Sequence, residues 1–367
     1  MNKVERMTTA ILHEEPDKVP RGEMEIEPIV MQRILGDGYV TPTDPESEFL
    51  NLKRTLEILN SDLVCIQPDL YPSSQILDID KKGNTLYRDA WGFEFWLAPH
   101  GGAKRPHRLL FNEPQQVYDY EFPKAADFSM AKLAKWATET DYFIFNSMIA
   151  TVGIGYTRLG FENFMTWTRT NPKEVCHWYE NICELNIALA ERCVKAGAHA
   201  ILFDDDIAFN SGPFLSPQIM REHVFPFYAR QVRAAKRLGV PAFFHSDGQL
   251  TKLLNDLVDV VGYDGWQSVQ SDVNDSKEIK ERYGDRLVLW GNISIDLLGR
   301  GTPEQVRDAV AELIPIAAPG GGFILSSSNS LGWETSASNA RALYDAAEEL
   351  GWYGRGEGGV ETHSRDS

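Results

Sequence analysis

The sequence predicts an α/β fold, and within that class a (β/α)8 TIM barrel. Short apolar runs recur along the 367 residues, and each is followed by a segment with the apolar spacing of a helix. This alternation is typical of a parallel sheet whose strands are connected by helices. We count eight such runs, and the chain is long enough to add N-terminal helices and an insertion to an eight-stranded barrel. An open, doubly wound sheet is the main alternative.

The predicted strands are spread over most of the chain. They are Val19 to Ile26, Leu63 to Gln67, Phe143 to Ile149, Ile201 to Asp205, Ala242 to His245, Gly265 to Val269, Leu287 to Asn292 and Phe323 to Ser327. Two of the predicted helices have clear starts, at Ser216-Pro217 and Thr302-Pro303, because a hydroxyl N-cap followed by proline favours the first helical turn.

The domain organisation follows from this pattern. We expect one barrel domain over residues 1–353, with an insertion at about 76–135 between the second and third strands. Residues 76–97 alternate apolar and polar side chains around Lys82-Gly83-Asn84, which predicts a β-hairpin in this insertion. The tail at 354–367 is rich in glycine and charge, and we expect it to be disordered.

Composition excludes several function classes. The chain has 36 Lys and Arg against 53 Asp and Glu, a formal charge of −17, which disfavours nucleic acid or an anionic membrane as the main partner. It has neither an N-terminal signal pattern nor an apolar run of membrane-spanning length, so we expect a cytoplasmic protein. Its four cysteines form no C-x-x-C pattern, which predicts neither a disulfide framework nor a zinc knuckle.

Polar residues gather where the predicted strands end, the edge at which barrel enzymes carry their chemistry. The clearest case is the stretch PAFFHSDGQL, in which an apolar run leads directly into His245, Ser246 and Asp247. The other strand ends contribute Glu23 and Glu25, the triplet Asp204 to Asp206, Gln267, Asn292, and Ser326 to Asn329.

A metal site is one interpretation of this edge. His245 and Asp247 are two residues apart, so in extended chain their side chains point the same way. Asp206 and Glu222 would supply further carboxylates, and zinc takes three or four ligands of these types. We therefore predict His245, Glu222 and Asp206 as metal ligands. The plainer alternatives are an acidic turn at 204–206 and a structural histidine at 245.

The chain resembles the uroporphyrinogen decarboxylase superfamily over nearly its whole length. The resemblance rests on the order of several blocks, which include PDKVPRG at 16–22, KAGAHAILFDDDIAFNSGPFLSPQIMREHVFPF at 195–227, GVPAFFHSDG at 239–248 and PGGGFILSSSNSLGWETSASN at 319–339. It implies a (β/α)8 barrel. Uroporphyrinogen decarboxylase proper carries an N-terminal arginine-rich block for the substrate's carboxylates, whereas Arg21 is followed here by three glutamates, at 23, 25 and 27.

Within this superfamily, the chain resembles the corrinoid-dependent methyltransferase branch more than uroporphyrinogen decarboxylase proper. In the coenzyme M enzymes zinc is bound by His-x-Cys-Gly and a later cysteine; His245 matches that histidine, while Asp247 and Asn329 stand at the cysteine positions. In some O-demethylase methyltransferases carboxylates and a histidine hold zinc, an order that Asp206, Glu222 and His245 reproduce. The resemblance thus implies zinc, a corrinoid carried by a partner protein, and a small methylated substrate such as an aromatic methyl ether.

We therefore predict a cobalamin-dependent methyltransferase, which could form a homodimer. The predicted catalytic residues are His245, Asp247, Asn329 and Asp205. The predicted substrate-binding residues are Glu25, Asn292, Gln267 and Trp167, the last of which could equally be core packing. Two alternatives stay open. One is a decarboxylase that uses Arg21, Lys104, Arg105 and Arg108 as a cationic pocket, and the other is a non-catalytic ligand-binding protein.

Overall fold

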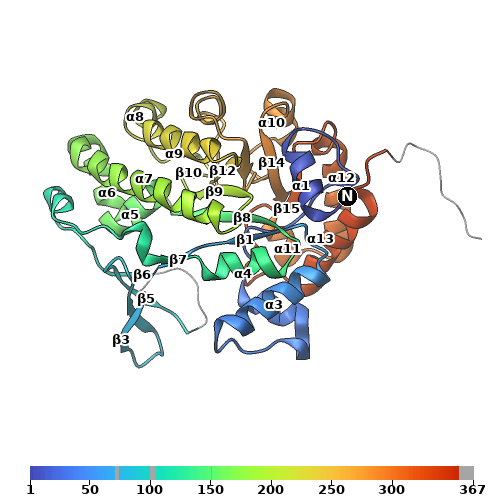
Figure 1. Cartoon of the computed structure of the whole chain (residues 1–367), viewed down its shortest axis with the longest axis horizontal. Coiled ribbons are helices and arrows are strands. Elements are labelled where there is room, and N and C mark those ends of the chain that lie inside the picture. Colours follow the sequence, from blue (N-terminus) through green and yellow to red (C-terminus); the bar gives the residue numbers. More distant parts are fainter. Residues whose placement is uncertain (71–73, 100–104, 150, 355–367) are drawn as a thin grey trace, which may run out of the picture.

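The protein, described from a computed structural model, is built around a curled sheet of seven parallel strands (Figure 1). The structure describes residues 1–70, 74–99, 105–149 and 151–354. The sheet order is β1 (Leu63–Ile66), β8 (Phe143–Met148), β9 (Ala200–Asp204), β12 (Ala242–His245), β13 (Gly265–Gln267), β14 (Val288–Ile293) and β15 (Phe323–Ser327). These strands confirm seven of the eight predicted ones to within two residues at each end, and all neighbours pair in parallel.

The prediction of a first strand at Val19 to Ile26 is wrong. This segment makes only isolated bridges, from Arg21 to Leu325 and from Ile26 to Leu331. Its backbone nevertheless bonds to both edges of the sheet, because Leu325 N donates to Pro20 O and Asp62 N, just before β1, donates to Arg21 O. Pro20 has no N–H to donate, so a regular ladder is interrupted there. The segment thus lies between β15 and β1, where the eighth strand of a barrel would be.

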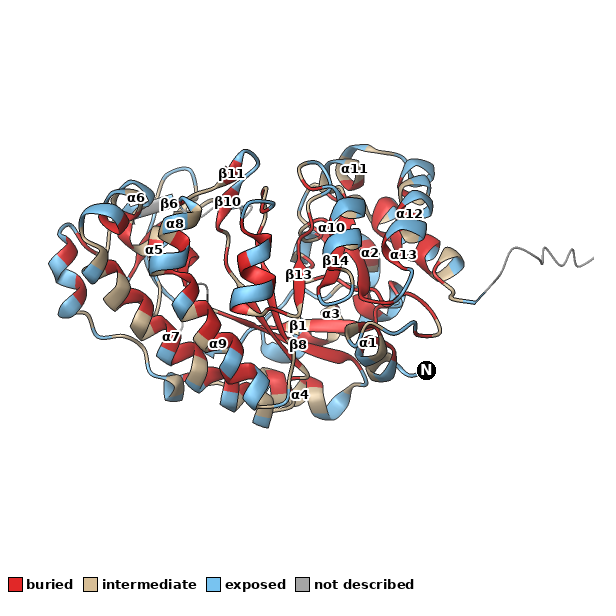
Figure 2. Cartoon of the chain, turned by 90° about the horizontal axis from the view of Figure 1, so that it is seen from above, coloured by how far each residue is buried: buried red, intermediate tan, exposed pale blue. Residues whose placement is uncertain are grey.

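Helices surround the sheet. Those that follow its strands are α5 (Val152–Leu159), α6 (Phe161–Thr170), α7 (Pro172–Lys195), α8 (Pro217–His223), α9 (Phe225–Arg237), α10 (Ser276–Tyr283), α11 (Ile295–Arg300), α12 (Pro303–Ala317) and α13 (Ala337–Leu350). Both predicted helix starts are confirmed, because Ser216 Oγ accepts from Ile219 N and Thr302 Oγ1 accepts from Gln305 N. Figure 2 shows buried residues in the strands and on the inner sides of these helices.

The interior of the sheet is filled by large apolar side chains. One inner cluster contains Leu63, Phe145, Leu202, Phe243, Trp290 and Ile324, together with Met7. Met7 belongs to α1 (Lys3–Ile11). The same cluster includes Phe143, Ala200 and Val288, which are the first residues of β8, β9 and β14. Helix α1 therefore closes the amino end of the sheet, and the carboxyl end is left for polar side chains.

The remaining N-terminal helices and the insertion lie beside the sheet (Figure 1). The helices are α2 (Pro28–Leu35), α3 (Pro45–Ile58) and α4 (Ala131–Glu139). The insertion contains β3 (Gln75–Ile79), β4 (Thr85–Arg88), β5 (Glu94–Leu97) and β6 (Arg105–Arg108). β3 and β4 pair antiparallel around the predicted turn, and the sheet continues to β6, so the element is a four-stranded antiparallel sheet.

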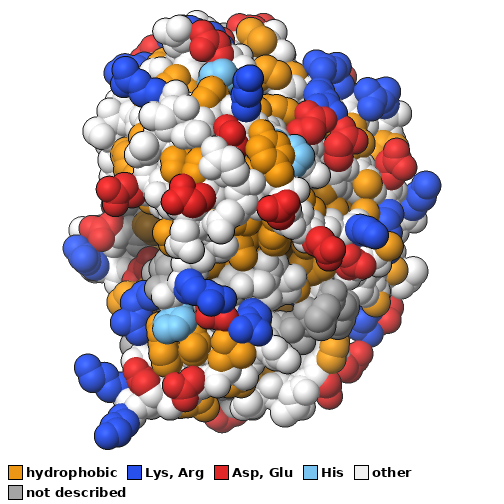
Figure 3. Space-filling model, turned by 90° about the vertical axis from the view of Figure 1, so that its left-hand side faces the viewer, with side chains coloured by type: hydrophobic (Ala, Val, Ile, Leu, Met, Phe, Trp, Pro, Cys, Tyr) orange, Lys and Arg blue, Asp and Glu red, His pale blue; other side chains and the backbone are white. Residues whose placement is uncertain are grey.

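Small elements complete the fold. They are the paired strands β2 (Asp69–Leu70) and β7 (Phe128–Ser129), the hairpin β10 (Ala208–Phe209) and β11 (Gly212–Pro213), the short helices at Gly36–Gly38, Pro114–Tyr118 and Ala125–Asp127, and a π-helical turn at Asp256–Val261. The side that carries the insertion presents hydrophobic side chains among acidic and basic ones (Figure 3). Within the described ranges, no helix has the length and apolarity required to cross a membrane. The predicted disordered tail lies, apart from Gly354, outside the described residues.

Candidate metal and substrate site

Polar side chains form the layer directly above the apolar interior, at the carboxyl end of the sheet. Strand side chains alternate in direction, so Asp204 and His245 lie two residues beyond the inward-facing Leu202 and Phe243 and point the same way. His245 is in register with Asp204 on β9 and with Gln267 on β13. Three neighbouring strands therefore bring a carboxylate, an imidazole and an amide side by side.

The orientation of the His245 ring is set by two amide contacts. Gln267 Nε2 donates to the backbone oxygen of Asn329 at 2.9 Å, which leaves Gln267 Oε1 to accept a hydrogen bond from His245 Nδ1. His245 Nε2 then faces carboxylates, at 3.5 Å from Asp206 Oδ1 and 4.0 Å from Asp204 Oδ1. When the ring is neutral, Nε2 presents its lone pair to this group.

Asp247 is held by partners on both of its oxygens. Ser268 Oγ donates to one oxygen and Asn329 Nδ2 donates to the other. The backbone N–H of Asp247 donates to Asp206 Oδ1 at 2.9 Å, which ties the ends of β9 and β12 together. Ser268 adopts a φ of +72°, an uncommon value for a residue with a side chain that is often found at functional sites.

Asp206, His245 and Asp247 form a group that could hold a metal ion. One ligand atom from each residue lies within 4.8 Å of the others. One imidazole nitrogen and two carboxylates are a ligand set that zinc accepts, and three protein ligands leave a position open for substrate. The hydrogen bonds from Gln267 to the ring and from Ser268 and Asn329 to Asp247 are the kind of outer contacts that orient metal ligands. The residues present therefore fit a divalent cation.

The electrostatics of the cluster also favour a cation. Burial lowers the pKa of His245, but the hydrogen bond to Asp206 and the charges of Asp204 and Asp247 outweigh it and raise the pKa to about 10. Burial raises the pKa of Asp204 and that of Asp247, and the negative charge of Asp206 adds to both shifts. Several carboxylates in one partly buried place repel one another, and a positive charge among them relieves that repulsion.

Two predicted residues lie away from this cluster. Glu222 is on α8 with 52% of its side chain exposed, and it accepts a hydrogen bond from Gln218. It is absent from the group of ligand atoms, in which Asp247 supplies the second carboxylate, so the predicted ligand set of His245, Glu222 and Asp206 is corrected at this position. The sequence placed Glu222 on the right helix, but that side chain points to solvent.

Asp205 has a different position from its two neighbours. Its buried carboxylate accepts backbone hydrogen bonds from Thr151, Val152 and Gly153 at the start of α5, and a fourth from Tyr228 Oη at 2.6 Å. Burial raises the pKa of Asp205 to about 7, although these hydrogen bonds act to lower it. This geometry makes Asp205 a residue that positions α5, because alternation along the strand directs it away from His245.

The predicted substrate-binding residues are distributed over several places. Gln267 is in the cluster, as described above, and Trp167 is buried in the core on α6. Asn292 donates to Ser276 Oγ and lines a separate groove. Glu25 lines a cavity of about 380 Å³ enclosed by segment 23–28, α3, α4 and the ends of β1 and β8. The described structure therefore brings together Gln267 and the cluster, and places Glu25 in a neighbouring cavity.

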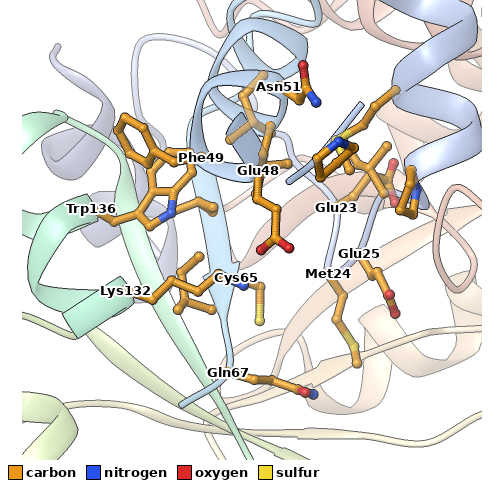
Figure 4. A pocket seen from close by; sticks show the side chains of 18 of the residues that line it. Glu23, Met24, Glu25, Glu48, Phe49, Asn51, Cys65, Gln67, Lys132 and Trp136 are labelled. Carbon is orange, nitrogen blue, oxygen red and sulfur yellow. The ribbon is translucent and has the colours of Figure 1, made fainter. Parts of the chain in front are cut away.

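Figure 4 shows this cavity from close by. It reaches Cys65 and Ser147, which lie at the ends of β1 and β8. Burial raises the pKa of the Cys65 thiol, and the nearby carboxylates of Asp204 and Glu25 add to the shift, so the cavity wall is close to the cluster. Glu48 and Lys132 also line it, and sequence reasoning missed both because their helices come from distant parts of the chain.

The cationic residues proposed for a decarboxylase do not surround the cluster. Arg21 is 1% exposed, donates to Asn60 O and to Glu348, and lies next to Asp62 at the amino end of the sheet. Arg108 pairs with Glu94 in the insertion, and Arg105 is on the same sheet. Lys104 lies outside the described residues. The only cation that the cluster itself contains among described residues is His245 when protonated.

Comparison with known proteins agrees with this architecture. The family model of uroporphyrinogen decarboxylase (URO-D) matches residues 147–350, and the chain belongs to this family. Among curated relatives, a methylated-thiol–coenzyme M methyltransferase of Methanosarcina mazei is 27% identical over 191 residues, 52% of this chain and 48% of the relative. A methylcobamide:CoM methyltransferase of Methanosarcina barkeri is 26% identical over 218 residues, 59% of this chain and 61% of the relative.

These matches cover about half of each of these relatives, and uroporphyrinogen decarboxylases of several bacteria also match at 24–28% identity. A solved structure of a methyltransferase from Methanosarcina mazei superposes with a TM-score of 0.72 at 19% identity, over 95% of this chain and 99% of that one. At this identity the superposition establishes the shared fold.

Proposed function

We propose that this protein is a corrinoid-linked methyltransferase that moves a methyl group between a small methylated substrate and a corrinoid protein. A zinc ion held by Asp206, His245 and Asp247 would serve this reaction. The observation that carries the proposal is this triad, at the carboxyl end of the sheet, in a family that includes methylcobamide and thiol methyltransferases. A methyl ether, aromatic or aliphatic, is the substrate class that suits it, because oxygen and nitrogen ligands favour a harder metal site than thiolates do.

Bound zinc would act as a Lewis acid on the heteroatom that carries the methyl group. The protein's own residues supply positioning. Gln267 holds the Nδ1–H tautomer of His245, so that Nε2 stays available as a ligand. Ser268 and Asn329 hold both oxygens of Asp247 and restrict its rotation. Asp205 fixes the start of α5 beside the same edge.

Two measurements test the proposal. Protein purified without chelator and reconstituted with zinc should contain about one metal ion per chain by inductively coupled plasma mass spectrometry, and His245→Ala should contain little. Single-turnover methylation of cob(I)alamin by a methyl ether, followed by absorbance, should require the same histidine. Absence of metal in the reconstituted wild type, or near-normal methyl transfer by His245→Ala, would refute the assignment.

Decarboxylation of a polycarboxylate is the weaker candidate. It is supported by the uroporphyrinogen decarboxylases among the relatives, but it needs cations around the site. Arg21 is engaged by Glu348 at the other end of the sheet, while the cluster carries three aspartates. A polycarboxylate such as coproporphyrinogen should therefore not bind, and tight binding of it would favour the decarboxylase.

A further inference from the structure

The cavity beside the cluster has walls from several parts of the chain. Segment 23–28 and α3 form one side, α4 another, and the ends of β1 and β8 the floor (Figure 4). Its volume of about 380 Å³ is in the range of small-molecule sites. Apolar side chains supply much of the lining, among them Met24, Phe49 and Trp136. The cavity is therefore of a size to hold a small molecule, and its wall at Cys65 lies near Asp204 of the cluster.

Charged side chains of both signs line this cavity without partners. Glu25, Glu48 and Lys132 make no side-chain hydrogen bond or ion pair to any residue that the structure describes, and the two glutamates are exposed while Lys132 is half-buried. Figure 4 shows Lys132 entering from the α4 side and Glu25 from the opposite side, with the Glu48 carboxylate between them. The cavity thus offers separate positive and negative positions that do not neutralise each other.

Two neighbouring charged residues differ from these three in having protein partners. Lys135, one turn further along α4, pairs with Glu46 and with Glu139 outside it. Glu23 lines the same cavity, but its carboxylate accepts hydrogen bonds from Ser327 and Tyr344. Side chains of the same types therefore have protein partners nearby, whereas Glu25, Glu48 and Lys132 are left to interact with solvent or a ligand.

The charge pattern discriminates between ligand classes. A ligand with only a carboxylate would face Glu25 and Glu48, with one lysine in its favour. A ligand with only an ammonium would meet Lys132 without compensation. A ligand that carries both groups pairs with both signs, and each such charge-assisted contact is worth more than a neutral hydrogen bond.

We propose that this cavity binds a small zwitterion, in which an ammonium group lies at Glu25 and Glu48 and a carboxylate lies at Lys132. This inference deepens the proposed function, since it makes the methylated substrate amino-acid-like rather than a neutral aromatic ether. It does not depend on turnover, because recognition uses the cavity's charges and not the metal triad.

Isothermal titration calorimetry with a matched series of probes tests it. O-methyl-L-serine carries both charges, 2-methoxyethylamine lacks the carboxylate, 3-methoxypropionate lacks the ammonium, and methoxybenzene is neutral. The wild type should bind O-methyl-L-serine about tenfold or more tighter than each of the others, as expected for one charged contact. Equal affinity for 3-methoxypropionate or methoxybenzene, or no detectable binding of O-methyl-L-serine, would overturn the proposal.

Variants assign the two ends of the ligand. Lys132→Met should remove the preference for O-methyl-L-serine over 2-methoxyethylamine, and Glu48→Gln should weaken the preference over 3-methoxypropionate. Lys135→Met, on the same helix but outside the set of residues that line the cavity, is the control and should change neither ratio. Unchanged ratios in Lys132→Met would contradict the proposal. Tight zwitterion binding without any methyl transfer to cob(I)alamin would instead refute the proposed methyltransferase activity and support the proposed binding site.

Discussion

The two ends of the sheet use charge in opposite ways. At the amino end, Arg6 donates to Asp17 and Asp62, and Arg21 and Lys18 both pair with Glu348. At the carboxyl end, Asp204, Asp206 and Asp247 surround a single imidazole, and Glu25 and Glu48 face a cavity without partners. Compensated charges hold the closed end together, while the open end keeps more carboxylates than cations and could accept a further positive charge.

The largest effect on stability should come from breaking the amino-end network. Arg6→Met leaves Asp62, which is 3% exposed, without one of its main cationic partners. Removing one member of a buried ion pair costs about 3 kcal/mol in the free energy of unfolding. Urea denaturation measures this loss in the free energy of unfolding. Lys3→Met removes an ion pair to Asp141, whose side chain is 72% exposed, and as the control should change stability by less than about 1 kcal/mol. Similar losses of stability in both variants would show that the buried ion pair of Arg6 contributes no more than the exposed one of Lys3.

Gln267→Leu tests the open end without touching a ligand. The substitution removes the acceptor for His245 Nδ1, so the ring loses the contact that sets its tautomer and orientation. Metal affinity or methyl transfer should fall about 10- to 100-fold, the usual effect of losing such an outer contact. Zinc titration with a competing chelator measures this. Full zinc affinity in Gln267→Leu would mean that the ring is oriented by its packing alone.

The pH dependence of stability should have opposite signs for Glu23, near the carboxyl end, and Asp17, at the amino end. Burial raises the pKa of Glu23, near the carboxyl end, from 4.5 to about 7 despite hydrogen bonds from Ser327 and Tyr344. The folded protein then keeps a proton that the unfolded chain releases, so this group's contribution to stability falls as pH rises from about 4.5 to 7, by about 2–3 kcal/mol. Glu23→Gln should flatten that decline in denaturation curves measured across this range.

For Asp17, at the amino end, the sign reverses. Arg6 and the N-terminus outweigh burial and hold the pKa of Asp17 well below its usual range. That carboxylate stabilises the fold above its unfolded pKa, and the contribution is lost as pH falls through the acid range. Asp17→Asn should therefore remove part of the acid sensitivity while leaving the decline between about pH 4.5 and 7 in place. If the loss of stability at acid pH is unchanged in this variant, the pKa of Asp17 is as low in the unfolded chain as in the folded protein.

The smallest expected effect is that of Asp204→Asn. Asp204 faces Nε2 of His245 at 4.0 Å but is not in the ligand triad, and burial and neighbouring carboxylates raise its pKa. Without metal, the substitution removes a repelled charge and should raise the free energy of unfolding by about 1 kcal/mol. Thermal unfolding of the metal-free protein measures this change. A loss of stability would indicate that Asp204 compensates His245 more than it repels Asp206.

Much of the site was predictable from the sequence, and the exceptions have a common cause. His245, Asp247, Asp206, Gln267 and Asn329 could be predicted because strand ends can be recognised locally and meet at one edge of a parallel sheet. Glu222 was misplaced, because sequence locates it on α8 but does not determine that its side chain points to solvent. The first predicted strand failed for a similar reason, since its pairing is interrupted by Pro20 and local apolar character could not reveal that.

The sequence by itself determined the alternation of strands and helices, the helix starts at Ser216 and Thr302, and the family. These depend on periodicity, capping and residue order, which act over a few residues or over ordered blocks. Only the tertiary structure decided which carboxylate joins Asp206 and His245, and that Glu25, Glu48 and Lys132 share one cavity. Segments separated by more than eighty residues meet there, and their meeting depends on packing around the whole sheet, which no local pattern encodes.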